Sequence, residues 1–240
     1  MVRVDRFRVR FHMGAPVVLS GHPLHFDGLL AALLDPTPDP VASRYVDPGL
    51  PLAREGDPSC YFYRASAWEI PAGEVFLDGL VRTTSWLDWA SEWVSGRPVE
   101  VGRGRYRQFR EQFEVIAAPE VMFYAEGDVD RVAAVLDRAW RGGYLALGPM
   151  RRMGYGVVIG VEVEVTADDF SVVGPDGWVA RHVPAAFAPP GAKGLRGYVP
   201  CRPPYWYLPR SVECLCPSPA RWLPHLRPAR AAVPAGVRGQ

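Results

Sequence analysis

The sequence predicts an α+β fold in which helices cover one face of an antiparallel sheet. Residues 7–13 and 157–165 alternate between apolar and polar side chains, which is typical of half-buried strands. Between them, residues 128–142 combine an aspartate at the N-cap, an apolar stripe at helical spacing and a closing glycine. Strands and helices therefore follow one another within a single architecture.

The first half of the chain supplies a strand, a helix and a hairpin. Residues 15–20 extend or re-enter the sheet, and residues 27–34 predict a short buried helix with Asp27 as its N-cap. A proline-rich loop covers residues 35–58. Two aromatic and β-branched runs then predict a hairpin around the turn at residues 71–73, with strands at residues 61–70 and 75–83.

The second half supplies the remaining strands. Residues 112–125 read as strand interrupted at Pro119, and residues 174–177 form a turn into a run at 178–183. The order strand, helix, hairpin, strand, helix, glycine-rich turn, strand is typical of a ferredoxin-like βαββαβ core, as in RNA-recognition modules. We expect this domain at residues 1–183 with an insertion at about 35–110. A proline-rich, irregular C-terminal extension at residues 184–240 would pack on it.

Composition limits the classes of function. The formal net charge of the 240 residues is +1, so a nucleic-acid surface must come from uneven placement of charge. Lys193 is the only lysine, a bias that phosphate recognition or a GC-rich genome explains equally. The longest apolar run, residues 29–34, is far shorter than the roughly 20 residues of a membrane span, and the N-terminus lacks a signal-peptide pattern. We expect a cytoplasmic protein.

Three separate segments are rich in arginine, and we expect each to present it without local neutralisation. The outward positions of the first strand are basic, and a second segment packs arginines and aromatics between residues 102 and 110, a combination used on single-stranded nucleic acid. A solvated charge run is the alternative, since Glu111 and Glu114 follow. The candidate RNA-binding residues of these two segments are Arg6, Arg8, Arg10, His12, Arg103, Arg105, Tyr106, Arg107 and Arg110.

The third segment is glycine-rich and lies between a predicted helix and a predicted strand. Glycine permits positive φ and lets backbone amides approach a polyanion, and two adjacent arginines add charge there. A tight helix-to-strand connection is the competing interpretation. A dinucleotide or P-loop site would need the opposite order of elements. The candidates in this segment are Gly148, Arg151, Arg152, Gly154, Tyr155 and Gly156.

Four stretches resemble the RAMP superfamily of CRISPR proteins, and within it the type IV member of the fifth Cas family. They are residues 25–31, residues 121–128, the glycine-rich residues 148–156 and residues 203–206. The resemblance implies a ferredoxin-like core that binds the 5′ handle of the guide RNA (crRNA). It also implies docking on the repeated backbone subunit and other effector subunits, with target DNA reached only through the complex. The chain carries Pro149 and Met150 where such loops commonly have basic residues, which shifts the expected phosphate contacts towards residues 103–110.

We expect a noncatalytic protein without a cofactor or metal. One alternative is a metal-independent endoribonuclease that processes repeat RNA, with His22 and His25 as candidates for general acid or base. Another is a structural interaction subunit, because eight tryptophans offer contact surface. The stripe of Trp86, Trp89 and Trp93 fits packing better than base stacking. A zinc site would have to come from Cys201, Cys214, Cys216 and His225, whose spacing is a weak signal.

Overall fold

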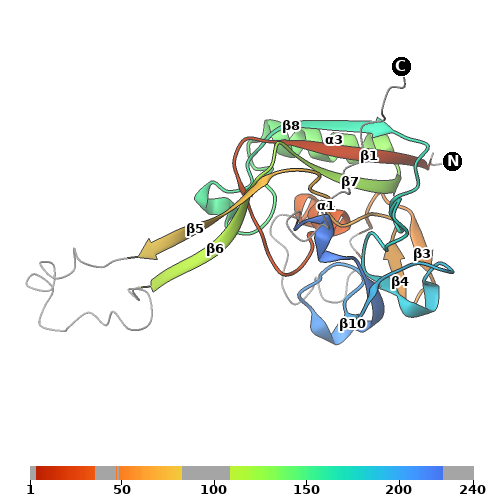
Figure 1. Cartoon of the computed structure of the whole chain (residues 1–240). Helices are drawn as coiled ribbons and strands as arrows, with labels where there is room; N and C mark the ends of the chain where they lie inside the picture. The colour runs from red at the N-terminus through yellow and green to blue at the C-terminus, as the bar shows by residue number, and fades with distance from the viewer. Residues whose placement is uncertain (1–3, 36–46, 48, 83–108, 224–240) are drawn as a thin grey trace, which may run out of the picture.

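The structure is a computed structural model that describes residues 4–35, 47, 49–82 and 109–223. Its central element is a three-stranded antiparallel sheet in the order β7-β1-β8 (Figure 1). Strand β1 (Asp5–Met13) lies in the middle, with β7 (Glu120–Gly127) on one side and β8 (Val158–Val165) on the other. The alternation predicted for the first and last of these strands is confirmed.

Two helices pack against this sheet and against each other. Helix α1 (Phe26–Leu34) and helix α3 (Val129–Arg141) enclose a core with the apolar side of β1, where Phe7, Val9 and Phe11 are fully buried. Asp128 caps α3 through a hydrogen bond from the amide of Arg131, and Gly142 closes it, as predicted. The N-cap of α1 is His25 and not Asp27, because the Asp27 carboxylate is bound elsewhere in the core.

A long two-stranded hairpin projects away from this body (Figure 1). Strand β5 (Glu74–Arg82) pairs with β6 (Phe109–Ala117), and the short β2 (Val17–Val18) adds to the other edge of β6. The prediction that residues 61–70 and 75–83 pair with each other is wrong. The proline and glycine at residues 71–73 separate two sheets instead of turning one strand back on its neighbour.

Residues 61–70 divide between two neighbours. Strand β4 (Tyr61–Tyr63) pairs with β3 (Arg54–Gly56), and the following residues make isolated antiparallel bridges to β7, at Ala65 with Ala125 and at Glu69 with Met122. In chain order β1, α1, β7, α3 and β8 alternate strand and helix around the main core. A continuous fourth strand is absent among the described residues, so the structure shows an α+β fold with small antiparallel sheets.

The C-terminal part contains regular structure where an irregular tail was predicted. Strands β10 (Leu195–Val199) and β11 (Val212–Cys216) pair, and β9 (Val183–Pro184) joins β11. Short 3-10 turns lie at residues 185–187, 208–210 and 219–221. A second apolar cluster forms around buried Phe62, Val183 and Cys214, while Trp222 inserts into the main core. Proline in this region limits strand length without preventing pairing.

In the described part of the chain, no helix combines the length and apolar character needed to cross a membrane.

Candidate RNA interface

The outward face of the central sheet carries the basic residues of β1, each with an acidic partner. The Arg8 guanidinium lies 2.5 Å from Glu164, and Arg10 forms ion pairs with Glu162 at 2.9 Å and with Glu120 at 3.1 Å. Arg6 lies within 4 Å of carboxylates on Glu126 and Asp169, and the His12 ring bonds Glu162 at 2.9 Å. These partners come from β7, from β8 and from the segment after β8.

The expectation that this face is free of neutralisation is therefore wrong. In the antiparallel ladder Arg8 faces Tyr124 and Glu164, and Arg10 faces Met122 and Glu162, so the carboxylates arrive from strands distant in sequence. The face presents three arginines against four glutamates, which are Glu120, Glu126, Glu162 and Glu164. A polyanion would meet little net positive charge here.

The glycine-rich loop has the backbone conformation that its glycines predict. Gly148, Gly154 and Gly156 have φ of +77°, +89° and +67°, and Met150 also has a positive φ of 58°. A Cβ on Gly156 would collide with the carbonyl oxygen of Leu147, so only glycine fits there. The amide of Gly156 donates to Pro16 at 2.8 Å, and that of Leu147 donates to Gly156 at 2.8 Å. The second bond ties the two ends of the loop together, and the first fixes the loop to the segment before β2.

Tyr155 fastens the loop to the middle of the β5–β6 hairpin. Its hydroxyl donates to Asp78 on β5 at 2.6 Å, and its ring meets Phe113 of β6 edge-on at 5.5 Å between centroids. This hydrogen bond lowers the pKa of Asp78 and raises that of Tyr155. The hydroxyl of Tyr155 is thus already engaged, and the residue positions the loop beside the hairpin.

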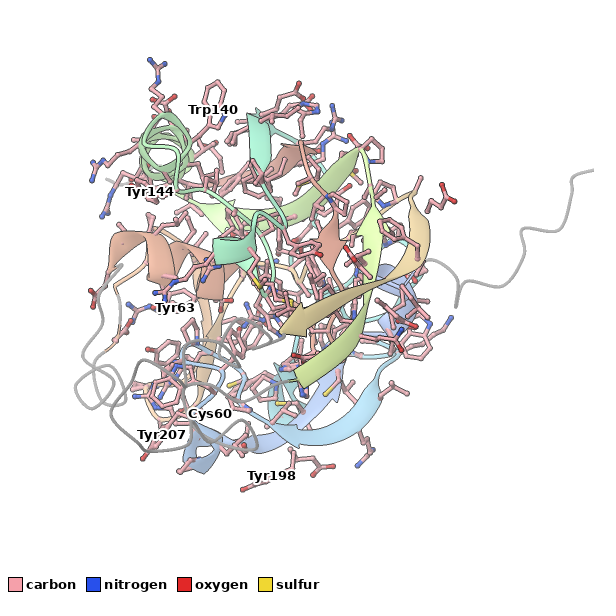
Figure 2. All side chains as sticks on the ribbon, turned by 90° about the vertical axis from the view of Figure 1, so that its left-hand side faces the viewer. Cys60, Tyr63, Trp140, Tyr144, Tyr198 and Tyr207 are labelled. Carbon is pink, nitrogen blue, oxygen red and sulfur yellow. The ribbon has the colours of Figure 1, made fainter. Side chains whose placement is uncertain are left out.

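Arg151 and Arg152 lie in the 3-10 turn Arg151–Met153 of this loop, and both are exposed. Neither forms an ion pair with any residue that the structure describes. They line a depression of about 320 Å³ together with half-exposed Tyr144 and Val157. Tyr144 lies near the end of α3 (Figure 2). The depression thus combines cationic donors with an aromatic surface, the two contacts used on single-stranded nucleic acid.

The arginine-rich segment falls largely outside the described residues. Arg103, Arg105, Tyr106 and Arg107 belong to the stretch that connects β5 to β6, as do the three tryptophans of the predicted packing stripe. Arg110 lies in β6, where its backbone pairs with Val81. In sequence, this segment leads directly into the hairpin on which the glycine-rich loop is docked.

The histidine proposed as a nuclease candidate is buried. His25 is 3% exposed, and its ring stacks on Tyr205 and meets His182 edge-on at centroid distances of 4.3 and 4.4 Å. Burial lowers the pKa of His25 well below its ordinary value, and the charges of His182 and Arg181 lower it further. A side chain in this position packs the interior and offers no surface to a substrate. His22, the second candidate, is exposed.

Sequence reasoning missed Arg181, which organises this interior. Its guanidinium is fully buried and pairs with Asp27 at 3.1 Å, and it also donates to the Tyr205 hydroxyl and to backbone carbonyls that include Cys201 and Ala65. Burial, the largest single influence, lowers the pKa of Arg181, but the combined attraction of Asp27, Tyr205 and Cys201 outweighs it and the pKa is raised. The signal available in sequence was a lone arginine within the apolar run at residues 178–183.

Arg181 also brings together two of the four stretches that carry the family resemblance. Asp27 comes from residues 25–31 and Tyr205 from residues 203–206, and the Tyr205 hydroxyl bonds the Asp27 carboxylate at 2.9 Å. Their role in this structure is to join the start of α1 to the C-terminal sheet.

Within the described ranges, no group of three or more histidine, cysteine or acidic side chains is arranged to hold a metal ion. Cys201 and Cys214 are buried free thiols, and burial raises the pKa of Cys201 to about 11. His225, the fourth ligand considered for zinc, lies outside the described residues.

Comparison with protein families identifies the family of this chain. Residues 52–217, well over half of the chain, match the family described as CRISPR type IV associated protein Csf3. The chain belongs to this family. No match was found among curated proteins.

The Csf3 match confirms the type IV CRISPR association that the sequence motifs predicted. It covers β3 to β11, and so includes the hairpin, the glycine-rich loop and Arg181. Membership of a CRISPR-associated family implies that the chain works in a larger complex.

Proposed function

We propose that this Csf3-family chain binds RNA as a noncatalytic subunit of a type IV CRISPR ribonucleoprotein. In this proposal it caps the 5′ handle of the guide RNA and docks on the backbone subunit, as the fifth Cas family does. The observation that carries the proposal is the pair Arg151 and Arg152, exposed and without a carboxylate partner in the described structure, on a glycine-rich loop beside the hairpin.

The RNA path in this proposal differs from the one expected from sequence. It follows the loop and the hairpin towards the arginine-rich residues 102–110 and avoids the outward face of the central sheet. Phosphate affinity depends on cations that are not already paired, because displacing a carboxylate costs part of the attraction gained. The arginines of β1 are paired and those of the loop are not.

The ferredoxin-like core remains part of this proposal. Residues 64–69 take the place of its missing strand, since the amide of Ser66 donates to Tyr124 and that of Glu69 to Met122, both on β7. The sheet would then read β8-β1-β7 followed by this segment. A ferredoxin-like sheet has the same order, with the second strand beside the third.

Equilibrium binding to repeat RNA over a series of salt concentrations tests the function. We expect a steep loss of affinity with salt. Arg151→Ala with Arg152→Ala should flatten the slope of log affinity against log salt by about 0.7 per phosphate contact removed from a single strand. Arg105→Ala with Arg107→Ala should act in the same direction.

The matched control is Arg8→Ala, which removes an arginine already paired with Glu164. It should leave the slope within error. A wild-type protein whose RNA affinity does not change with salt would contradict the proposal and favour a purely structural subunit.

Repeat RNA incubated with the protein in EDTA tests the nuclease alternative separately. We expect the RNA to stay intact over hours. Cleavage that disappears with His22→Ala would replace the noncatalytic assignment by a metal-independent nuclease.

A further inference from the structure

A second and larger depression lies between the β3–β4 hairpin and the segment that connects β10 to β11. Its volume is about 490 Å³. Its lining includes three arginines, one tyrosine and two aspartates. These residues are Arg54, Arg202, Arg210, Tyr61, Asp47 and Asp57. In Figure 2 the labelled residues of this region, Cys60, Tyr63 and Tyr207, lie below Trp140 and Tyr144, which mark the end of the molecule near the glycine-rich loop.

Tyr61 is covered by cations in this pocket. The guanidinium carbon of Arg202 lies 3.9 Å from the centroid of the Tyr61 ring, and that of Arg54 lies 5.0 Å from it. Cation–π contacts at these distances hold an arginine in place while leaving its edge donors for hydrogen bonds. Arg202 therefore faces the pocket in a fixed orientation.

The acidic residues of the pocket are already used locally. Asp47 forms an ion pair with Arg54 at 2.7 Å and accepts a hydrogen bond from the Tyr63 hydroxyl at 2.5 Å. Asp57 accepts from the amides of Ser59 and Cys60 and from the Ser59 hydroxyl. These bonds lower the pKa of Asp57, led by the one from the Ser59 hydroxyl. Both carboxylates remain charged and stabilise the turns that shape the pocket.

Arg202 still has donor capacity that the described structure does not use. Its Nη1 is a buried atom without a hydrogen-bond partner, and no carboxylate of the described residues pairs with it. A buried donor without an acceptor is unfavourable, and an anionic oxygen is the acceptor that a guanidinium binds best. Arg210 lines the same pocket, and its Nη1 donates to the carbonyl of Pro203 at 3.2 Å.

We propose that this pocket binds a phosphate group of a nucleotide, held by Arg202 and Arg210, with Arg54 and Tyr61 fixing the walls. The planar fork of arginine matches two phosphate oxygens, and Arg202 has an unused donor that such an oxygen would satisfy. The proposal deepens the RNA-binding function and rests on it for the source of the phosphate, which is then a nucleotide of the guide. A free nucleotide carries the same chemistry.

The experiment measures binding of inorganic phosphate, adenosine 5′-monophosphate, and a short oligoribonucleotide with either a 5′-phosphate or a 5′-hydroxyl. Arg202→Ala should weaken binding of adenosine monophosphate at least tenfold. It should weaken to the same extent whichever of the two oligoribonucleotides binds through this pocket. Arg138→Ala is the matched control, because Arg138 is exposed on α3 away from the pocket. It should change the affinity neither for adenosine monophosphate nor for the oligoribonucleotide. Arg202→Lys keeps the charge and should weaken binding less than Arg202→Ala.

The ligands separate the sources of the phosphate. Tighter binding of the oligoribonucleotide than of adenosine monophosphate, lost in Arg202→Ala, assigns the site to an RNA strand. A preference for the 5′-phosphate over the 5′-hydroxyl assigns it to the strand end. Equal binding of adenosine monophosphate and RNA assigns it to free nucleotide.

The proposal is overturned if the folded wild-type protein binds neither phosphate nor adenosine monophosphate, or if Arg202→Ala and Arg138→Ala behave alike. Thermal unfolding of each variant verifies that it folds. The Arg151→Ala, Arg152→Ala protein should retain binding of adenosine monophosphate, so failure at this pocket and failure of the loop as an RNA interface give different results.

Discussion

The β1 face and the glycine-rich loop both carry arginine, but the arginines are in opposite electrostatic situations. On β1, Arg8 and Arg10 each lie opposite a carboxylate of the neighbouring strand β8 and form an ion pair with it. On the loop, Arg151 and Arg152 stand on a 3-10 turn with no ladder partner, and the structure pairs neither with a described carboxylate. A strand inside a sheet has neighbours on both sides, whereas a loop at the edge has few.

The difference shows that a run of basic residues without acids nearby in sequence does not establish a basic surface. Cross-strand neighbours decide the charge of a sheet face, and they come from distant parts of the chain. An arginine that forms an ion pair with a carboxylate stabilises the fold. An arginine without such a carboxylate partner is available to a ligand. The experiments below test this division.

We expect the largest effect at Arg181, the arginine whose ion pair is fully buried. Arg181→Ala removes the cation of a fully buried ion pair and leaves the Asp27 carboxyl buried without it. We expect a loss of about 3–5 kcal/mol in the free energy of unfolding, measured by urea denaturation. A loss under about 1 kcal/mol would mean that the buried pair does not hold α1 to the C-terminal sheet.

Acid should destabilise the same interior. Burial lowers the pKa of His182 to about 4, and that of His25 also lies well below its ordinary value of 6.5. Between pH 6.5 and about 4 the unfolded chain takes up protons that the folded chain refuses, so stability falls as the pH falls. Each histidine contributes about 1.4 kcal/mol per pH unit. His182→Gln should make a plot of unfolding free energy against pH shallower in this range.

Gly156→Ala tests whether loop conformation and arginine placement go together. The new Cβ would meet the carbonyl of Leu147, and φ of +67° disfavours alanine. We expect a loss of about 2 kcal/mol in stability, with reduced RNA binding because the loop shifts. Gly191→Ala is a suitable control, since Gly191 also has positive φ but open space around it. Equal losses in the two variants would trace the effect to backbone strain alone.

We expect the smallest effect from removing the carboxylates that neutralise the basic residues of the β1 face. Glu162→Gln with Glu164→Gln removes two exposed carboxylates and leaves Arg8 and His12 without their partners. Non-specific RNA affinity at low salt should rise about two- to fivefold, since a neighbouring charge in water is worth about 1 kcal/mol. Unchanged affinity would show that pairing is not what keeps RNA from this face.

Local patterns predicted the elements that local forces control. The alternation of residues 7–13, the cap at Asp128 and the glycines of the 148–156 loop appear in the structure as expected. Pairing partners were less predictable. The run at residues 75–83 was assigned to residues 61–70 and pairs instead with β6, because a strand carries no local signal for which distant strand it will meet.

The candidate site was predicted in part for the same reason. Arg151 and Arg152 were identified from their glycine-rich surroundings, and they are exposed. The β1 arginines were identified from sequence as a free basic face, and their partners lie more than 100 residues away. Arg202 and Tyr61 gave no pattern, and the lone Arg181 in an apolar run did not reveal its partner, since these contacts join segments that are far apart in the chain.

The sequence by itself determined the α+β class, the position of α3, the need for glycine in the loop and, through its motifs, the type IV CRISPR family. Those properties depend on backbone sterics, helix caps and periodicity, which act over a few residues. Only the tertiary structure decided which arginines are neutralised, that His25 is interior, and that three arginines and Tyr61 line one pocket. Electrostatic pairing and burial are properties of neighbours in space, and folding brings those neighbours from anywhere in the chain.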